Sequence, residues 1–209
     1  MTTSTILTSV AVKKIAKKIK NGYELSLQLY DTGVYDAMYL AGLVAEPAKM
    51  TVADLQHWAE AATCHSLREY TVAWVTAESP HCVAMAMQWI HSGNADWASI
   101  GWNALSDYVA MTPDDKLDIA TLQELLLHVE KVIHTAANRE KYTMNGFVIA
   151  VGVYVTPLST QARTIAHNIG KVTVYMGDTA CKVPFGPEYI EKCITKSGVG
   201  KKRKSVRCL

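Results

Sequence analysis

Residues 51–92, TVADLQHWAEAATCHSLREYTVAWVTAESPHCVAMAMQWIHS, decide the fold class. Three times in succession, apolar residues recur here at the i, i+3, i+4, i+7 spacing of an amphipathic helix. The three sets are Leu55, Trp58, Ala59 and Ala62; Tyr70, Ala73, Trp74 and Ala77; and Val83, Ala86, Met87 and Ile90. Two of these helices also begin with the spacing of a capping box, Thr51 with Asp54 and Ser66 with Glu69. The stretch therefore predicts three short helices in a row, each with one apolar face.

The same spacing continues in both directions and predicts helices along nearly the whole chain. The expected ranges are 9–20, 23–31, 34–45, 51–63, 66–78, 80–92, 94–111, 117–136, 138–155, 157–169 and 186–197, with N-caps at Asn94, Asp118 and Asn138. Because the connections are short, neighbouring helices should be antiparallel. Helices of this length cannot each bury a private core, but stacked pairs bury a continuous one. The prediction is an all-α solenoid of antiparallel helix pairs, HEAT-like repeats, with a compact helical bundle as the alternative.

Two segments near the C-terminus break the helical pattern. Residues 171–184 form an irregular segment, in which Val172, Val174 and Tyr175 favour a short strand or an extended loop. Residues 199–209 are rich in bases and poor in apolar residues, which predicts a flexible basic tail. The sequence thus predicts one helical domain over residues 1–198, followed by this tail.

Composition narrows the classes of protein. No stretch approaches the roughly 20 apolar residues that a membrane span requires. The first nine residues lack the charged and apolar regions of a secretory signal, and the five cysteines are odd in number and irregularly placed. These features predict reduced thiols and a cytoplasmic protein. The pairs Cys64-His65 and His81-Cys82 lack the ligand spacing of zinc sites, so neither a metal nor a cofactor is expected.

The net charge of +2 conceals two basic ends around an acidic middle. All 19 acidic residues lie between residues 21 and 195. The basic ends consist of Lys13, Lys14, Lys17, Lys18 and Lys20, and of Lys196, Lys201, Lys202, Arg203, Lys204 and Arg207. A helix face with five lysines and no acid is either a solvated surface or, as favoured here, a contact for a polyanion.

Several strings, in order, resemble the DNA alkylation repair (AlkD-like) family of HEAT-like repeat proteins. They are LYDTGVYDAMYLAGL at 29–43, MTVADLQHW at 50–58, WIHSGN at 89–94, and the ending TACKVP at 179–184 followed by GKKRK at 200–204 and Cys208. The resemblance covers most of the chain from about residue 10. It implies a helical solenoid that holds duplex DNA in a basic channel, and active members release N3- and N7-alkylated purines.

The family's catalytic positions carry other residue types in this chain. Alignment through the 50–66 stretch places the catalytic aromatic and aspartate at Arg68 and Val72. The phosphate-gripping arginine falls near Ala98 or Ser99, and the second aromatic near Val151. Asp96 beside Trp97 is the remaining carboxylate–aromatic pair, either as a relocated site or as a first-turn acid beside a core tryptophan.

Duplex DNA, held by salt-sensitive backbone contacts, is the predicted partner. The predicted contacts are Lys13, Lys14, Lys17, Lys18, Lys20, Arg68, Arg139, Lys141, Lys201, Lys202, Arg203, Lys204 and Arg207. Three functions remain open: a glycosylase acting on alkylated bases, a non-catalytic module for duplex or branched DNA, and a protein-interaction scaffold.

Overall fold

The computed structural model describes residues 9–178 and 181–207, and its helices follow the predicted ranges closely. The α-helices are α1 Ser9–Ala16, α2 Tyr23–Asp31, α3 Tyr35–Val44, α4 Val52–Ala61, α5 Ala73–Ala77, α6 Cys82–Ile90, α7 Ala95–Met111, α8 Ile119–Val132, α9 Asn138–Tyr154, α10 Ser159–Ile169 and α11 Gly186–Ser197. A π-helical turn, Leu67–Val72, leads directly into α5. Single 3-10 turns occupy Pro47–Lys49, Asp114–Lys116 and Thr156–Leu158.

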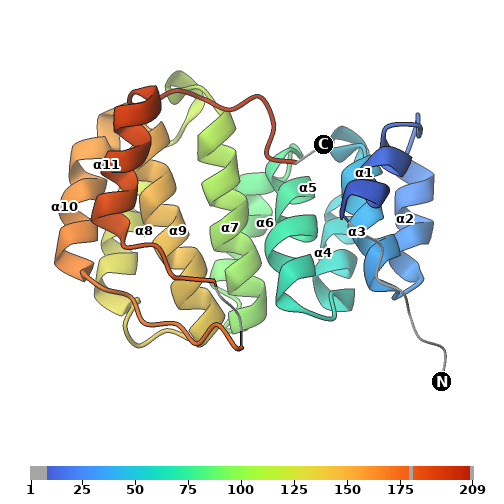
Figure 1. Ribbon diagram of the computed structural model, residues 1–209, viewed down its shortest axis with the longest axis horizontal. Helices are drawn as coiled ribbons and strands as arrows, with labels where there is room; N and C mark the ends of the chain where they lie inside the picture. Colours follow the sequence, from blue (N-terminus) through green and yellow to red (C-terminus); the bar gives the residue numbers. More distant parts are fainter. Residues whose placement is uncertain (1–8, 179–180, 208–209) are drawn as a thin grey trace.

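The helices stack as successive pairs in two layers (Figure 1). One layer, here called the odd layer, runs through α3, α5 with its π turn, α7, α9 and α11, each packed on the next. The even layer holds α2, α4, α6, α8 and α10, which pair with the helices of the odd layer, and α1 packs on α3. This arrangement confirms the all-α solenoid of antiparallel helix pairs. Within the described ranges, no helix is both long and apolar enough to cross a membrane.

Local capping explains several helix starts. At α4 the predicted capping box forms, because Thr51 N donates to Asp54 Oδ2 (2.8 Å) and Asp54 N donates to Thr51 Oγ1 (3.1 Å). Asn94 and Asp118 cap α7 and α8 as predicted. The predicted capping box of Ser66 does not form, since the chain there is already helical and widens into the π turn. Side-chain capping therefore marks the start of α4 but not the start of the helical stretch that leads into α5.

Two hydrophobic cores fill the space between the layers, and α7 contributes to both. Trp58 and Trp89 are fully buried in the first core, and the Trp58 ring stacks on Tyr30 at 4.1 Å between centroids. Trp102 on α7 is fully buried in the second core, beside Phe147. Gly101 lets α7 approach α6, because a Cβ there would lie 2.7 Å from the carbonyl oxygen of Ala86. The α7 helix therefore packs against both halves of the solenoid and separates their two cores.

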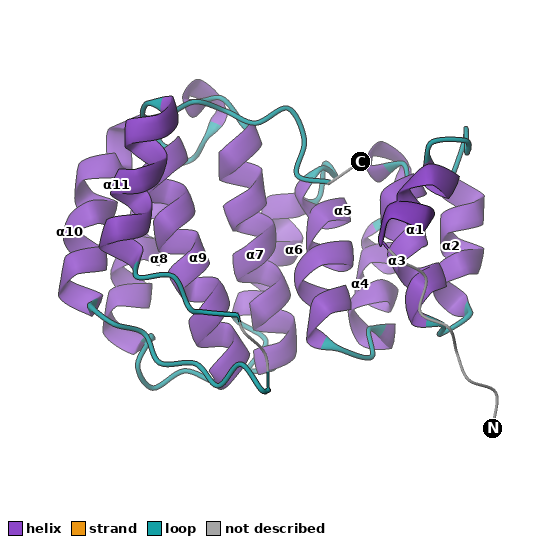
Figure 2. Ribbon diagram, in the orientation of Figure 1, coloured by secondary structure: helices purple, strands orange, loops and turns teal. Residues whose placement is uncertain are grey.

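The predicted flexible tail is wrong for residues 200–207. After α11 the chain crosses back over α7 toward the first half of the molecule (Figure 2). Val206 is only 3% exposed and belongs to the first core, and Arg203 N donates to Ala110 O at 2.7 Å. We call residues 200–207 the C-terminal strap. The strap is held by partners far away in the sequence, and these cannot be predicted from the composition of the segment alone. Cys208 and Leu209 lie outside the described residues.

The irregular segment is extended, with no β-strand in its described part. Val172 and Val174 face the second core, and Tyr175 points outward. Asn138, predicted as an N-cap, instead holds Tyr175 by two hydrogen bonds, from Tyr175 N to Oδ1 (2.7 Å) and from Nδ2 to Tyr175 O (2.8 Å). These bonds dock the segment against the start of α9. Thr179, part of the family-like ending, lies outside the described residues.

Candidate nucleic-acid interface

The five N-terminal lysines form an exposed basic surface. Lys14, Lys17, Lys18 and Lys20 are exposed and Lys13 is half-buried, while Val12 and Ala16 pack into the first core. The predicted helix 9–20 ends earlier, at Ala16, and tightens into a turn in which Lys18 N donates to Ile15 O at 3.0 Å. Among the described residues, no carboxylate lies within 4 Å of any of these ammonium groups. Their charge is therefore available to an external anion.

Arg139, predicted as a phosphate contact, is instead bound within the protein. Its Nε donates to Glu69 Oε1 at 2.7 Å, and its Nη2 donates to Glu69 Oε2. Glu69 lies in the π turn and is only 1% exposed. A buried carboxylate without a partner would be strongly destabilising, and the two hydrogen bonds from Arg139 offset that cost. Burial disfavours the charged form of Arg139, but its hydrogen bonds to the Glu69 carboxylate outweigh this effect and raise the pKa of the guanidinium. This ion pair connects the start of α9 to the π turn.

The arginine also supports an aromatic ring. Its Cζ lies 4.5 Å from the centroid of the Tyr142 ring, and its Nη1 donates to Met176 Sδ at 3.6 Å. Asn103 on α7 donates through Nδ2 to Glu69 O. Three helical elements and the irregular segment therefore meet around one buried ion pair.

The weak catalytic candidates Asp96 and Trp97 do not form a site together. Asp96 pairs with Arg68, with Nη2 3.1 Å from Oδ2, so neither charge stands alone. Trp97 is half-buried and packs against the first core. Adjacent helical residues point to different faces, which is the physical reason for their separation.

Apart from Arg68, which is half-buried, the positions that alignment equated with the family's catalytic residues lie inside the protein. Val72 and Val151 are fully buried, and Ala98 and Ser99 are buried on α7. Their side chains pack between helices and cannot reach a bound nucleic acid. The structure therefore offers no carboxylate or aromatic group at those positions.

A cavity of about 360 Å³ lies where the π turn, the start of α9 and the irregular segment meet. Its lining is mostly aromatic and polar, with His65, Tyr70, Arg139, Tyr142, Tyr175, Met176, Gly177 and Cys181. Burial raises the pKa of the Tyr70 and Tyr142 hydroxyls above the ordinary value of 10, so both stay neutral and can donate hydrogen bonds. We call this the tyrosine cavity.

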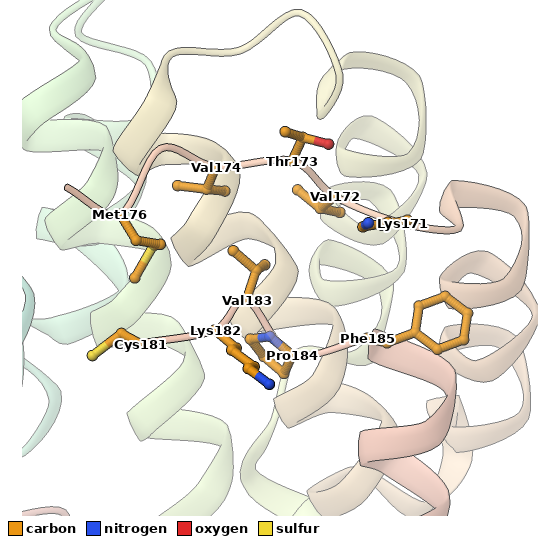
Figure 3. Close-up of a pocket in the computed structure, with 10 residues that line it drawn as sticks. All are labelled: Lys171, Val172, Thr173, Val174, Met176, Cys181, Lys182, Val183, Pro184 and Phe185. Carbon is orange, nitrogen blue, oxygen red and sulfur yellow. The ribbon is translucent and has the colours of Figure 1, made fainter. Parts of the chain in front are cut away.

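A second hollow, of about 750 Å³, adjoins it and is mainly apolar. Figure 3 shows the two extended stretches that border it, 171–176 and 181–185, with Val174 and Val183 pointing toward each other across the space. Asn145 Nδ2 donates to Pro184 O at 2.9 Å and fixes the second stretch to α9. Met176 and Cys181 line both hollows, so the two form one continuous depression.

The remaining predicted contacts divide into exposed and internally bound groups. Lys141 is half-buried at the start of α9, and Lys201, Arg203 and Lys204 are exposed. Lys202 and Arg207 are held within the protein, the first by Asp114 and the second by Glu78. Two residues of the basic ending are therefore structural rather than available.

The clustering of Tyr70, Tyr142 and Tyr175 was not predicted from the sequence. They lie at 70, 142 and 175 along the chain, and the only signal in the sequence was a high tyrosine content. Glu69 was predicted as half of a capping box, because its true partner is 70 positions away.

Two known proteins are similar to this chain over most of its length. The chain is 32% identical over 184 residues to the uncharacterized protein Lmo0209 of Listeria monocytogenes, covering 87% of this chain and 79% of the relative. It is 30% identical over the same length to the uncharacterized protein Lin0241 of Listeria innocua, with the same coverage. No family model matches.

Among solved structures, one resembles this chain along nearly its whole length. It is described as "A new family of proteins related to the HEAT-like repeat DNA glycosylases with affinity for branched DNA structures". The TM-score is 0.88 and the sequence identity 35%, covering 97% of this chain and 86% of that one.

Proposed function

This chain belongs to the family of proteins related to the HEAT-like repeat DNA glycosylases, and on that premise we propose that it binds branched DNA without cleaving glycosidic bonds. The observation that carries the proposal is the arrangement of charge. Five N-terminal lysines have no carboxylate partner in the described structure, whereas the buried carboxylate beside the tyrosine cavity is neutralised. The affinity for branched DNA stated for the solved relative points to the same ligand.

Loss of the cleavage step follows from electrostatics. A glycosylase must stabilise a sugar that becomes cationic as the base leaves, and a free carboxylate supplies that stabilisation. Here Glu69 is bound on both oxygens by Arg139, and Asp96 is bound by Arg68. Neither pair presents net negative charge to a sugar, and the described lining of the tyrosine cavity contains no other carboxylate.

Binding of a branch follows from the spacing of the basic groups. The lysines of the first turns lie at one end of the solenoid, whereas Lys141 and Lys182 lie on elements of the other half. Duplex arms that diverge from a branch point can contact both sets at once, and two linked contacts bind more tightly than either alone. A DNA partner also fits the cytoplasmic location that the sequence predicted.

The test is fluorescence anisotropy with a four-way junction and a linear duplex of equal length, across a salt series. We expect tighter binding to the junction and a steep loss of affinity with salt, because each neutralised phosphate contributes about one unit to the salt slope. The double variant Lys14→Gln/Lys17→Gln should lower that slope by about two. The matched control is Lys116→Gln/Lys131→Gln, which removes two exposed lysines from the even-layer side.

A parallel assay measures release of methylated bases from N-methylated duplex DNA. The expected rate is the spontaneous one. Release above that rate would favour the glycosylase reading instead, and equal affinity for junction and linear duplex would remove the preference for branches.

A further inference from the structure

The tyrosine cavity has the size of a site for one small planar group. Its volume of about 360 Å³ is near the lower end of the range of roughly 300–1,000 Å³ typical of small-ligand sites. A double helix cannot enter such a space. One group projecting from a nucleic acid can.

Two rings at the cavity are unusually open to solvent. Tyr175 is 76% exposed and Tyr70 is 43% exposed, although both belong to a residue type that normally buries its ring. Exposed tyrosines around a concave surface present flat faces for stacking, and every nucleobase has a π-face to match.

Two parts of the cavity are held in place by contacts within the protein. Tyr142 lies over the guanidinium of Arg139, which is fixed in turn by the buried carboxylate of Glu69. The backbone of Tyr175 is fixed on both sides by Asn138. A backbone that is already fixed loses little freedom on binding, which favours affinity.

The charge of the cavity selects against phosphate. Its one permanent cation, Arg139, is compensated by Glu69, and no lining carboxylate is present in the described part of the chain. The tyrosine hydroxyls and His65 remain as hydrogen-bonding groups. A neutral, planar ligand with donors and acceptors at its edge fits this combination best.

We propose that the tyrosine cavity receives one unpaired nucleobase at the branch point, stacked on Tyr70 and Tyr175. The inference rests on the proposed function, because the branch supplies the unpaired base while the lysines hold the duplex arms. In this proposal the tyrosine cavity recognises the branch point, and the N-terminal lysines supply the affinity for any DNA duplex.

The experiment compares two three-way junctions that differ at one position. One carries a single unpaired thymine at the branch point, and the other carries an abasic analogue there. Anisotropy should show roughly tenfold tighter binding to the thymine junction, the factor expected for one base–aromatic stack. The variant Tyr70→Ala/Tyr175→Ala should lose this preference and keep its salt-dependent affinity for the abasic junction.

Two further variants separate stacking from folding. Tyr70→Phe/Tyr175→Phe keeps both rings and should keep the preference, whereas Tyr35→Ala removes a ring that is 42% exposed but lies at the start of α3, outside the cavity. Equal binding of the two junctions by the unmodified protein, or a preference that survives loss of both rings, would overturn the base site alone. Failure to bind either junction would overturn the proposed function and the base site with it.

Discussion

The two basic runs look alike in the sequence, but in the structure the second is partly bound within the protein. The N-terminal lysines face solvent without carboxylate partners in the described residues. In the C-terminal strap, Lys202 Nζ donates to Val109 O (2.9 Å) and Tyr154 O (2.6 Å), and Arg207 Nη1 donates to Ala45 O (2.9 Å). A count of basic residues therefore overstates the charge available to DNA, and only the contacts show which of these side chains are bound within the protein.

The difference has a cause in helix geometry. Val109, Tyr154 and Ala45 lie at the C-terminal ends of α7, α9 and α3, where backbone carbonyls lack partners within the helix. Helix C-termini carry partial negative charge, so a cation that reaches them is stabilised. The strap delivers two cations to three such ends, and the N-terminal lysines meet none in the described structure.

The strongest test of this contrast ends the chain at Gly198. Removing the strap should lower the free energy of unfolding by about 4 kcal/mol, because several charge-assisted hydrogen bonds and the burial of Val206 are lost together. Urea unfolding followed by circular dichroism measures the change. An unchanged midpoint would show that the strap merely rests on the surface.

A single substitution separates a bound base from an exposed one within the strap. Arg207→Gln should cost about 2 kcal/mol, since it leaves Glu78 and the end of α3 without their cation. Arg203→Gln, which alters an exposed side chain, should cost less than about 0.5 kcal/mol. The same urea experiment compares them, and equal losses would contradict the division.

Burial of Asp107 on α7 creates a pH dependence that Arg203 of the strap opposes. Burial raises the pKa of this carboxyl to about 7, with Arg203 opposing the rise and Glu78 adding to it. The unfolded value is near 4, so the native state holds an extra proton between about pH 4 and 7 and loses stability as the pH rises through that window.

Asp107→Asn should remove this slope and stabilise the protein at pH 8 by about 1–2 kcal/mol. Unfolding curves at pH 5.5 and 8 measure it, with Asp115→Asn as an exposed control. A variant that keeps the full pH dependence would point to another titrating group.

The smallest effect on stability belongs to the free run. Lys17→Gln/Lys18→Gln should change the free energy of unfolding by no more than about 0.5 kcal/mol, because neither side chain has a carboxylate partner in the described structure. The same variant should lower the affinity for DNA. A marked loss of stability would mean that these lysines, like Lys202, support the fold.

Most of the helices could be predicted from the sequence, because apolar periodicity and capping are local properties. The boxes at Thr51 and the caps at Asn94 and Asp118 depend on residues three or fewer positions away. The tyrosine cavity and the strap depend on pairs such as Glu69 with Arg139 and Glu78 with Arg207, which periodicity cannot relate. The charged residues Glu69 and Arg139 were therefore singled out from the sequence, but their pairing with each other was not predicted.

The position of Val206 has a consequence for how the protein is made. A stack of helix pairs normally completes each unit as it is added, since a pair contacts only its neighbours. Here a residue of the first core follows every helix in the sequence, so it leaves the ribosome after all of them. The first core therefore keeps a gap until translation has passed residue 206, and the N-terminal half completes its packing only after all the described helices have been made.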